Sequence, residues 1–321
     1  MRRLRLLMIL PVVALLSACD MVVMAPAGDV AAQQRDLLVV STLLMLLIIV
    51  PVMGLIVFFA WKYRASNKEA QYEPDWDHST SLELVIWSAP LLIIICLGAL
   101  TWAGTHLLDP YRPLDRIKPG QAVAEDVAPL QVNVVALDWK WLFIYPEYGV
   151  ATVNELAAPV DRPIRFHITS SSVMNSFYIP ALAGQIYAMP GMETKLHAVI
   201  NHPGEYEGFS ANYSGDGFSH MRFAFHGLDR AGFDRWIVGV RQGGQPLDRE
   251  RYLELEKPSE KVPAIRFSNV EGGLWDAILN MCVEPGKMCM GEMMEIDRRG
   301  GLTMASVRNT MPLVYDKYAG R

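Results

Sequence analysis

The sequence is short of cysteine and nearly balanced in charge. It has four cysteines among 321 residues, and none of them forms a C-x-x-C pair, which argues against a zinc site. The net charge of −5 is small and indicates no nucleic-acid partner. Hydrophobic residues make up 51% of the chain and are concentrated in its first third, so two soluble domains would not account for the composition.

The stretch 203–221 lacks the residues that its setting would suggest. It contains a Gly- and Ser-rich loop between two alternating apolar runs, where a β-sandwich can hold a metal between strand ends. It has no Cys, no carboxylate at the usual spacing and one poorly placed histidine, His220. His226 follows in the next run, but a mononuclear copper site also needs a thiolate or more imidazoles. The sequence therefore predicts a metal-type loop without metal ligands.

The N-terminus has the pattern of a bacterial secretion signal. A basic start precedes the apolar stretch 6–16, which is too short to span a bilayer. Leu16-Ser17-Ala18-Cys19 resembles a lipoprotein box and predicts a signal peptide at 1–18, lipid attachment at Cys19 and an outer segment at 19–36. The alternatives are an ordinary signal peptide and an uncleaved first span.

Two uncharged apolar runs predict transmembrane helices at 37–61 and 84–105, joined by a loop at 62–83. Lys and Arg near the helix ends do not decide the orientation. A lipidated Cys19 must reach the outer face, so we expect the loop in the cytoplasm and everything after His106 in the periplasm of a Gram-negative cell. A lipid anchor and two spans are more attachment than a soluble domain needs. This suggests that the helices pack against other membrane subunits in the bilayer of the inner membrane.

Glu83 stands at the cytoplasmic start of the second predicted span. One interpretation is a carboxylate that favours the positive end of a helix dipole. The other is a carboxylate that collects protons at the membrane surface.

The rest of the chain is predicted to form an outer domain. Pro- and Gly-containing residues 106–127 predict a linker, and short alternating segments within 128–227 predict a Greek-key β-sandwich. The apolar spacing then becomes helical, so 228–280 is predicted to be a helical extension that ends in an irregular cap around Phe267. The Met- and Gly-rich stretch 281–321 is predicted to be a loosely ordered tail.

Cys282 and Cys289 lie in this tail among several methionines. In an oxidising periplasm a disulfide between them is favoured. Free thiols and a cuprous-ion site built from Cys and Met are the alternatives.

Several motifs occur in a fixed order after the two spans. They are Asp138-Trp139-Lys140-Trp141, Val173-Met-Asn-Ser-Phe-Tyr-Ile-Pro, Gln185-Ile-Tyr-Ala-Met-Pro-Gly-Met and the 203–221 loop. Together, from Cys19 to about Phe267, they resemble subunit II of the haem–copper terminal oxidases. The resemblance implies a cupredoxin-like fold for the outer domain.

Cytochrome c oxidases of this family carry a dinuclear copper centre in that domain, built from thiolates, imidazoles, a Met and a backbone carbonyl. Five of the six corresponding positions here hold other residues, and only the Met is retained: Asn175, Ser210, Asn212, Ser214, Phe218 and Met221. A serine hydroxyl does not ionise near neutral pH to bridge copper, and Phe has no ligand atom. The pattern therefore resembles the bo-type ubiquinol oxidase branch, which lacks this copper centre.

The resemblance implies a complex that oxidises ubiquinol, reduces oxygen to water and pumps protons. Haem and copper would belong to the partner subunit I, with subunits III and IV as further partners and no metal in this chain. Trp139 and Trp141 match an aromatic pair at the oxidase interface, and Glu83 matches a carboxylate at the mouth of a proton-uptake route.

Two other hypotheses compete with this one. A copper-containing cytochrome c oxidase subunit II is opposed by the serines and Phe218 at ligand positions. A stand-alone membrane lipoprotein that binds a ligand is opposed by the Trp-capped second span and the retained Trp139 and Trp141.

Overall fold

The computed structural model of the chain describes residues 21–71, 73–124 and 126–298. Cys19 lies outside these residues. The chain forms two compact units. One consists of Gln33–Asp109, and the other of the residues up to Ala32 together with those from Pro110 onward.

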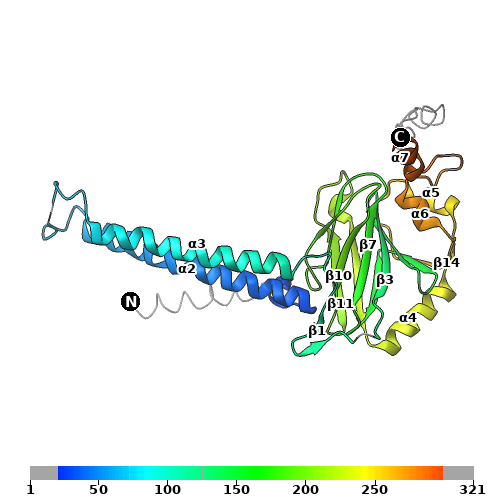
Figure 1. Ribbon diagram of the computed structural model, residues 1–321, viewed down its shortest axis with the longest axis horizontal. Helices are drawn as coiled ribbons and strands as arrows, with labels where there is room; N and C mark the ends of the chain where they lie inside the picture. Colours follow the sequence, from blue (N-terminus) through cyan, green and yellow to red (C-terminus); the bar gives the residue numbers. More distant parts are fainter. Residues whose placement is uncertain (1–20, 72, 125, 299–321) are drawn as a thin grey trace. The chain divides into compact units, whose positions relative to one another are not determined.

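The first unit is a helical hairpin made by α2 (Asp29–Lys62), from Gln33 onward, and α3 (Thr80–Leu107) (Figure 1). Both helices are long and apolar enough to cross a membrane. They contain the predicted spans 37–61 and 84–105 and extend beyond them, because the backbone hydrogen bonding of a helix continues into its polar flanks.

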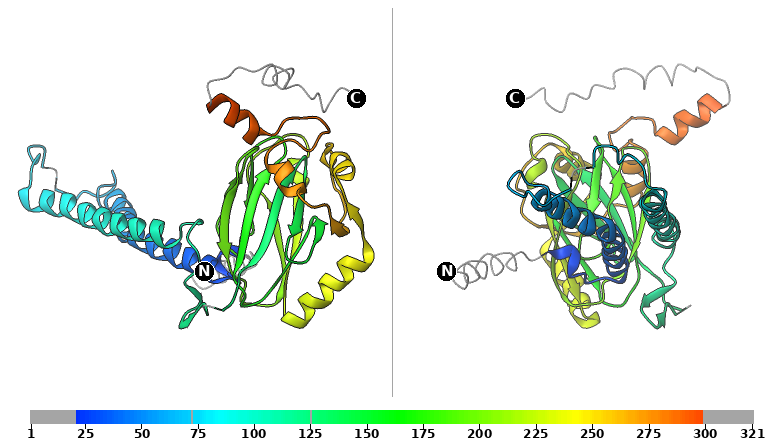
Figure 2. Two further views of the ribbon diagram at one scale, coloured as in Figure 1. Left: turned by 45° about the vertical axis from the view of Figure 1, so that its right-hand side comes forward. Right: turned by 90° about the vertical axis from the view of Figure 1, so that its left-hand side faces the viewer.

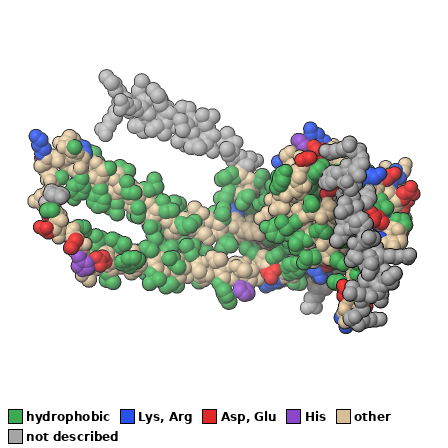
Figure 3. Space-filling view, turned by 90° about the horizontal axis from the view of Figure 1, so that it is seen from above, with side chains coloured by type: hydrophobic (Ala, Val, Ile, Leu, Met, Phe, Trp, Pro, Cys, Tyr) green, Lys and Arg blue, Asp and Glu red, His purple; other side chains and the backbone are tan. Residues whose placement is uncertain are grey.

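Apolar side chains lie exposed along both helices, as Figure 3 shows in green. Leu84 and Trp87 are 70% and 76% exposed. The hydroxyl of Thr105 donates to the carbonyl of Thr101 at 2.8 Å, so this polar group is satisfied within its own helix. The exposed apolar side chains of the two helices need a lipid or protein neighbour, because water would not solvate them favourably.

The second unit contains a sandwich of two sheets (Figure 2). The larger sheet has the order β10-β7-β3-β4-β5-β14-β13 and the smaller one β6-β12-β11-β8-β9. The strands that carry the predicted domain are β3 (Leu130–Leu137), β4 (Lys140–Tyr145), β5 (Val150–Val153), β6 (Glu155–Pro159), β7 (Ile164–Ser170), β8 (Asn175–Tyr178), β9 (Ile186–Ala188), β10 (Thr194–Ala198), β11 (Gly204–Ser210) and β12 (Arg222–Leu228). The predicted sandwich is thus confirmed.

An aromatic cluster fills the space between the sheets. The rings of Phe177 and Phe223 are stacked with centroids 5.5 Å apart, and Trp141 contacts both edge-on from the opposite sheet. Phe143 and Phe166 also contact Phe177, and all five side chains are at most 3% exposed. The alternation of apolar residues in the sequence follows from this packing, since every second side chain of a strand points inward.

The C-terminal extension adds two strands to one edge of the larger sheet and covers part of its other face. Its elements are α4 (Arg230–Gly243), β13 (Gln245–Leu247), α5 (Arg249–Glu256), β14 (Ile265–Val270), α6 (Leu274–Leu279) and α7 (Met290–Arg298). Tyr252, Leu274 and Ile278 pack against Leu142 and Ile144, so the central strands are buried on both faces. Buried strands of this kind carry continuous apolar runs.

Two predictions about this extension were wrong. Phe267 lies in β14, which pairs antiparallel with β5, and not in an irregular cap. The stretch 281–298 is not a loose tail, because it contains α7 and a Cys282–Cys289 disulfide. Residues 299–321 lie outside the described part of the chain.

The segments on either side of the hairpin also join the sandwich unit. The chain before α2 forms a short 3-10 helix, Val22–Met24, and Gly28 then pairs with Ile200. A Cβ on Gly28 would lie 2.4 Å from the carbonyl oxygen of Val199, so only glycine allows this approach. The predicted linker 106–127 is not wholly irregular, because it contains the hairpin of β1 (Arg116–Lys118) and β2 (Gln121–Ala122).

Candidate functional site

The six positions of the copper-type site lie at one end of the smaller sheet, where β8 begins and β11 ends. β8 pairs with β11 through Phe177 and Ser210, and the amide of Ser210 donates to the carbonyl of Met221 at 3.1 Å. The short 3-10 helix Phe218–His220 returns the chain from the loop to β12. Strand pairing thus brings together positions that are far apart in the sequence.

A direct hydrogen bond joins two of these side chains. The hydroxyl of Ser210 lies 3.1 Å from Oδ1 of Asn175 and donates to it. The amide nitrogen of Asn175 donates to the carbonyl of Val173 at 3.1 Å. Both side chains are buried, at 3% and 1% exposed, and Met221 is 1% exposed. The polar atoms are therefore satisfied within the protein, as burial requires.

The remaining positions supply an amide at Asn212, a hydroxyl at Ser214 and a phenyl ring at Phe218. Asn212 donates through its amide to the carbonyl of Met174 at 3.3 Å, and the ring of Phe218 packs against Tyr213. Soft copper sites of the electron-transfer type need thiolate and imidazole donors. These residues supply hydroxyl, amide, thioether and phenyl groups, so the donor set does not fit a dinuclear copper centre.

Trp139 and Trp141 are both buried within this chain, at 4% and 0% exposed. The indole N–H of Trp139 donates to the carbonyl of Ser214 at 2.9 Å, and the loop at Gly215 and Gly217 lies against its ring. The prediction of Trp141 as a subunit-interface residue is wrong, because a side chain in the core offers no surface to a partner. Trp139 supports the loop from beneath.

Glu83 lies in the first turn of α3 and is exposed. Its carboxylate is 2.7 Å from Nδ1 of His78, whose Nε2 lies 3.2 Å from the hydroxyl of Thr80. The sequence prediction did not include His78. Its position five residues before Glu83, next to the helix start, is the signal that could have identified it.

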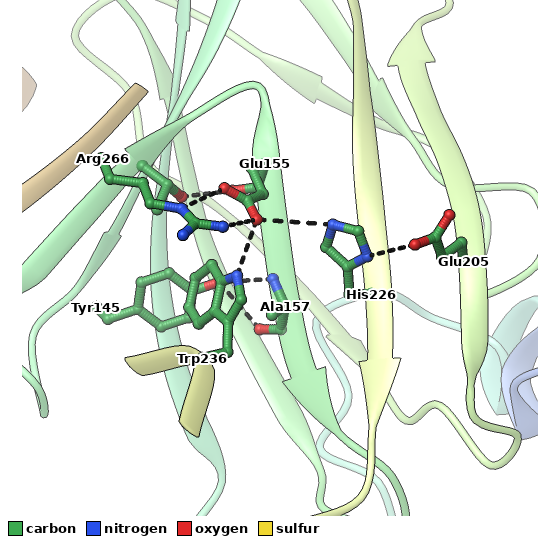
Figure 4. A network of polar contacts seen from close by, with 8 residues as sticks. Tyr145, Glu155, Ala157, Glu205, His226, Trp236 and Arg266 are labelled. Atoms are coloured by element: carbon green, nitrogen blue, oxygen red, sulfur yellow. Dashed lines mark hydrogen bonds and ion pairs between the residues drawn. The ribbon is translucent and has the colours of Figure 1, made fainter. Parts of the chain in front are cut away.

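A buried carboxylate, Glu155, ties the C-terminal extension to the sandwich (Figure 4). It accepts from Arg266 of β14 at 2.9 and 2.7 Å and from the indole of Trp236 of α4 at 2.9 Å. His226 lies 3.7 Å from the same carboxylate and 3.6 Å from Glu205. Burial opposes ionisation of Glu155, but the contacts with Arg266 and Trp236 prevail and lower its pKa.

Cys282 and Cys289 form a disulfide that closes a seven-residue separation. The thioethers of Met290 and Met281 meet over Gly191, where a Cβ would lie 2.9 and 3.5 Å from their sulfurs. The disulfide occupies both thiols, so the described geometry favours the disulfide interpretation over a thiolate copper site.

Comparison with known proteins agrees with this geometry. The family described as cytochrome c oxidase subunit II, periplasmic domain, matches residues 147–227, and the family described as COX aromatic rich motif matches residues 241–286. A cytochrome bo(3) ubiquinol oxidase subunit 2 from Pseudomonas putida is 50% identical over 278 residues, which cover 86% of each chain. The chain belongs to the ubiquinol oxidase subunit II family.

Other relatives of this ubiquinol oxidase family are similar over most of the chain. The subunit from Pseudomonas aeruginosa is 51% identical and the alignment covers 83% of this chain and 77% of the relative. A ubiquinol oxidase subunit 2 from Acetobacter aceti is 46% identical, with 83% and 84% covered. All three relatives are named as subunit 2 of a ubiquinol oxidase.

Proposed function

We propose that this chain is the subunit II of a membrane-bound quinol:oxygen oxidoreductase and carries no redox centre of its own. The observation that supports this most directly is the buried Asn175–Ser210 hydrogen bond, which occupies the position of two copper ligands. Electrons then enter the complex from a membrane quinol through another subunit. The expected cofactors, haem and copper, belong to subunit I, and subunits III and IV complete the assembly.

The role of this chain is assembly and support of the periplasmic face of subunit I. The long apolar faces of α2 and α3 are suited to neighbouring membrane helices or lipid. At the copper-type end of the sandwich, Val173, Met174 and Tyr213 are 44%, 40% and 74% exposed, which suits a protein partner more than water. Lipid attachment at Cys19, after removal of the signal peptide 1–18, would add a third anchor in the inner membrane.

Two competing functions are less well supported. A cytochrome c oxidase subunit II would require thiolates at Ser210 and Ser214 and an imidazole at Phe218. A stand-alone lipoprotein would not need two apolar helices, since one lipid anchor and one span already hold a domain at a membrane.

The function is tested by purifying the chain from its native membrane in mild detergent. We expect a haem-containing partner, oxygen-dependent oxidation of ubiquinol, and only substoichiometric copper in the chain expressed alone. Recovery of the chain without a haem protein would contradict the assembly role. A purple dinuclear-copper absorption spectrum of the chain alone would contradict the assignment of electron entry to another subunit.

Replacement of Glu83 tests its proposed role in proton uptake. We expect Glu83→Ala to reduce proton-coupled oxygen reduction by the assembled complex several-fold, because the carboxylate and His78 form an exposed proton-accepting pair at the start of the helix. Turnover is measured as oxygen consumption with saturating ubiquinol. Glu73→Ala is the matched control, since Glu73 is an exposed carboxylate of the same loop. Equal turnover of the two variants would mean that Glu83 has no role in proton uptake and is only a carboxylate at the start of the helix.

A further inference from the structure

Four consecutive apolar side chains at the start of the described chain are exposed. The exposed fractions are 61% for Met21, 47% for Val22, 41% for Val23 and 39% for Met24. Among the other described residues of the sandwich unit, exposed large apolar side chains occur singly or, at 173–174, as a pair. A run of four such side chains in water is unfavourable and indicates a lipid or protein neighbour. Residues Met21–Met24 are called the apolar turn.

The backbone of the apolar turn forms hydrogen bonds of its own. The amide of Met24 donates to the carbonyl of Met21 at 2.8 Å, and the amide of Ala25 donates to the carbonyl of Val22 at 3.1 Å. A segment that leaves water must satisfy its backbone groups internally or with the polar headgroup layer. These two bonds therefore lower the cost of moving the turn into the boundary between headgroups and acyl chains, while its side chains stay exposed.

The chain after the turn leads directly into a membrane helix. The amides of Ala27 and Gly28 both donate to the carbonyl of Ala181 at 2.9 Å, and α2 begins at Asp29. The uncharged apolar run of α2 begins at Leu37. The helix between these two positions is about 12 Å long, because a helix rises about 1.5 Å per residue. The polar layer of a bilayer is about 5–7 Å thick on each side of the hydrocarbon core, so the start of α2 lies close to the headgroups.

The chain before the turn leads to the proposed lipid-attachment site. Cys19 precedes Met21 by two residues, so the chain between them spans at most about 7 Å. A lipid on Cys19 places that residue at the membrane surface and the turn beside it. Between Asp20 and Asp29 the sequence has no charged residue, so no ionised side chain opposes insertion of this stretch. A lipid environment suits this composition better than a protein surface, whose apolar centre is usually surrounded by a polar rim.

We propose that the apolar turn inserts its four side chains into the boundary between the headgroups and the acyl chains of the bilayer that α2 crosses. The turn is then a peptide anchor beside the lipid on Cys19, and the inference rests on the lipid attachment of the proposed function. Stable attachment to a membrane takes two apolar signals close together. The turn and α2 hold both ends of the stretch 25–28 at the membrane surface.

The location of the turn is measured with a nitroxide spin label at Val23→Cys. The Cys96→Ser background removes the free cysteine of the described residues, and the same background without Val23→Cys gives the residual signal. The assembled complex is reconstituted into vesicles of phosphatidylethanolamine and phosphatidylglycerol, and collisions of the label with oxygen and with a water-soluble nickel chelate are recorded. We expect frequent oxygen collisions, and nickel collisions at least about threefold rarer than at Val238→Cys. Val238 is the matched control, since it is a valine of α4 that is 49% exposed.

The two collision rates separate lipid from water and from protein. Nickel collisions as frequent as at Val238→Cys would place the turn in water and overturn the proposal. A label that neither oxygen nor nickel reaches would place the turn against another subunit and would overturn it as well. Mass spectrometry of the same sample detects the lipid on Cys19. An unlipidated Cys19 would contradict the lipid attachment separately, while the position of the label alone decides whether the turn is inserted.

Discussion

Phe223→Ala is expected to lower the free energy of unfolding of the outer domain by about 3–5 kcal/mol. Phe223 is 3% exposed, and its ring stacks on Phe177 and contacts Trp141 and Phe143 from the opposite sheet. Truncation removes the central contact between the two sheets and leaves a cavity that the rigid strands cannot close. Denaturant unfolding of the full-length chain in detergent, followed by tryptophan fluorescence, measures the loss.

Gly208 provides an internal test of this explanation. A Cβ at Gly208 would lie 2.0 Å from the ring of Phe223, so Gly208→Ala should destabilise the wild-type domain by about 1–3 kcal/mol. In the Phe223→Ala background the same change should cost much less, because the clashing ring is gone. Additive effects would refute the packing argument. Tyr187→Ala, at a side chain that is 49% exposed, serves as the control and should change stability by less than about 0.5 kcal/mol.

Local patterns in the sequence predicted the strands of the sandwich and the two long helices. The side chains of β12, and those of β7 up to Ile168, alternate between buried and at least partly exposed, which is the pattern that a half-buried strand requires. β14 was missed because its sequence, Ile-Arg-Phe-Ser-Asn-Val, carries only a short alternation after a polar stretch. Its structure depends on pairing with β5, more than a hundred residues earlier in the chain, and local propensity does not contain that information.

The candidate site, like the fold, could be predicted only in part from the sequence. The order of the motifs assigned six residues to copper-type positions, and strand pairing brings three of them, Asn175, Ser210 and Met221, to one end of a sheet. The sequence did not predict that Asn175 and Ser210 bond to each other, because side-chain contacts depend on rotamers and on the register between strands. The burial of Trp141 was also missed, since a motif match carries no information on which face of a strand points inward.

The contact between Glu155 and Arg266 joins residues 111 positions apart, and no spacing rule relates them. Glu155 nevertheless begins a run of otherwise uncharged residues, Leu156–Pro159. A carboxylate in a buried strand must be paired or neutralised, so such a residue indicates that a cation packs there even when the cation cannot be identified.

Glu155→Ala is expected to destabilise the outer domain by about 1–3 kcal/mol, because it removes the acceptor of the Arg266 guanidinium, although water can replace part of that contact since the Arg266 side chain is 41% exposed. The indole N–H of Trp236 loses its acceptor as well. Since these partners lie on β14 and α4, the C-terminal extension should detach first. Limited proteolysis within 230–298 and denaturant unfolding measure the two effects. Glu205→Ala removes a carboxylate that is 85% exposed and should cost less than about 0.5 kcal/mol.

The pH dependence of stability separates the charge of Glu155 from its shape. Because its pKa is lowered below the ordinary 4.5, its stabilising effect is complete above that pH and is lost as the pH falls through the lowered value. Glu155→Gln keeps the shape and cannot ionise, so the stability difference between wild type and this variant should shrink below pH 4.5. In the double variant Glu155→Gln/Arg266→Gln the cost should be less than the sum of the single changes, since each single change already breaks the pair. A pH-independent difference, together with additive costs, would mean that Glu155 acts by packing and that the extension is held by its apolar contacts alone.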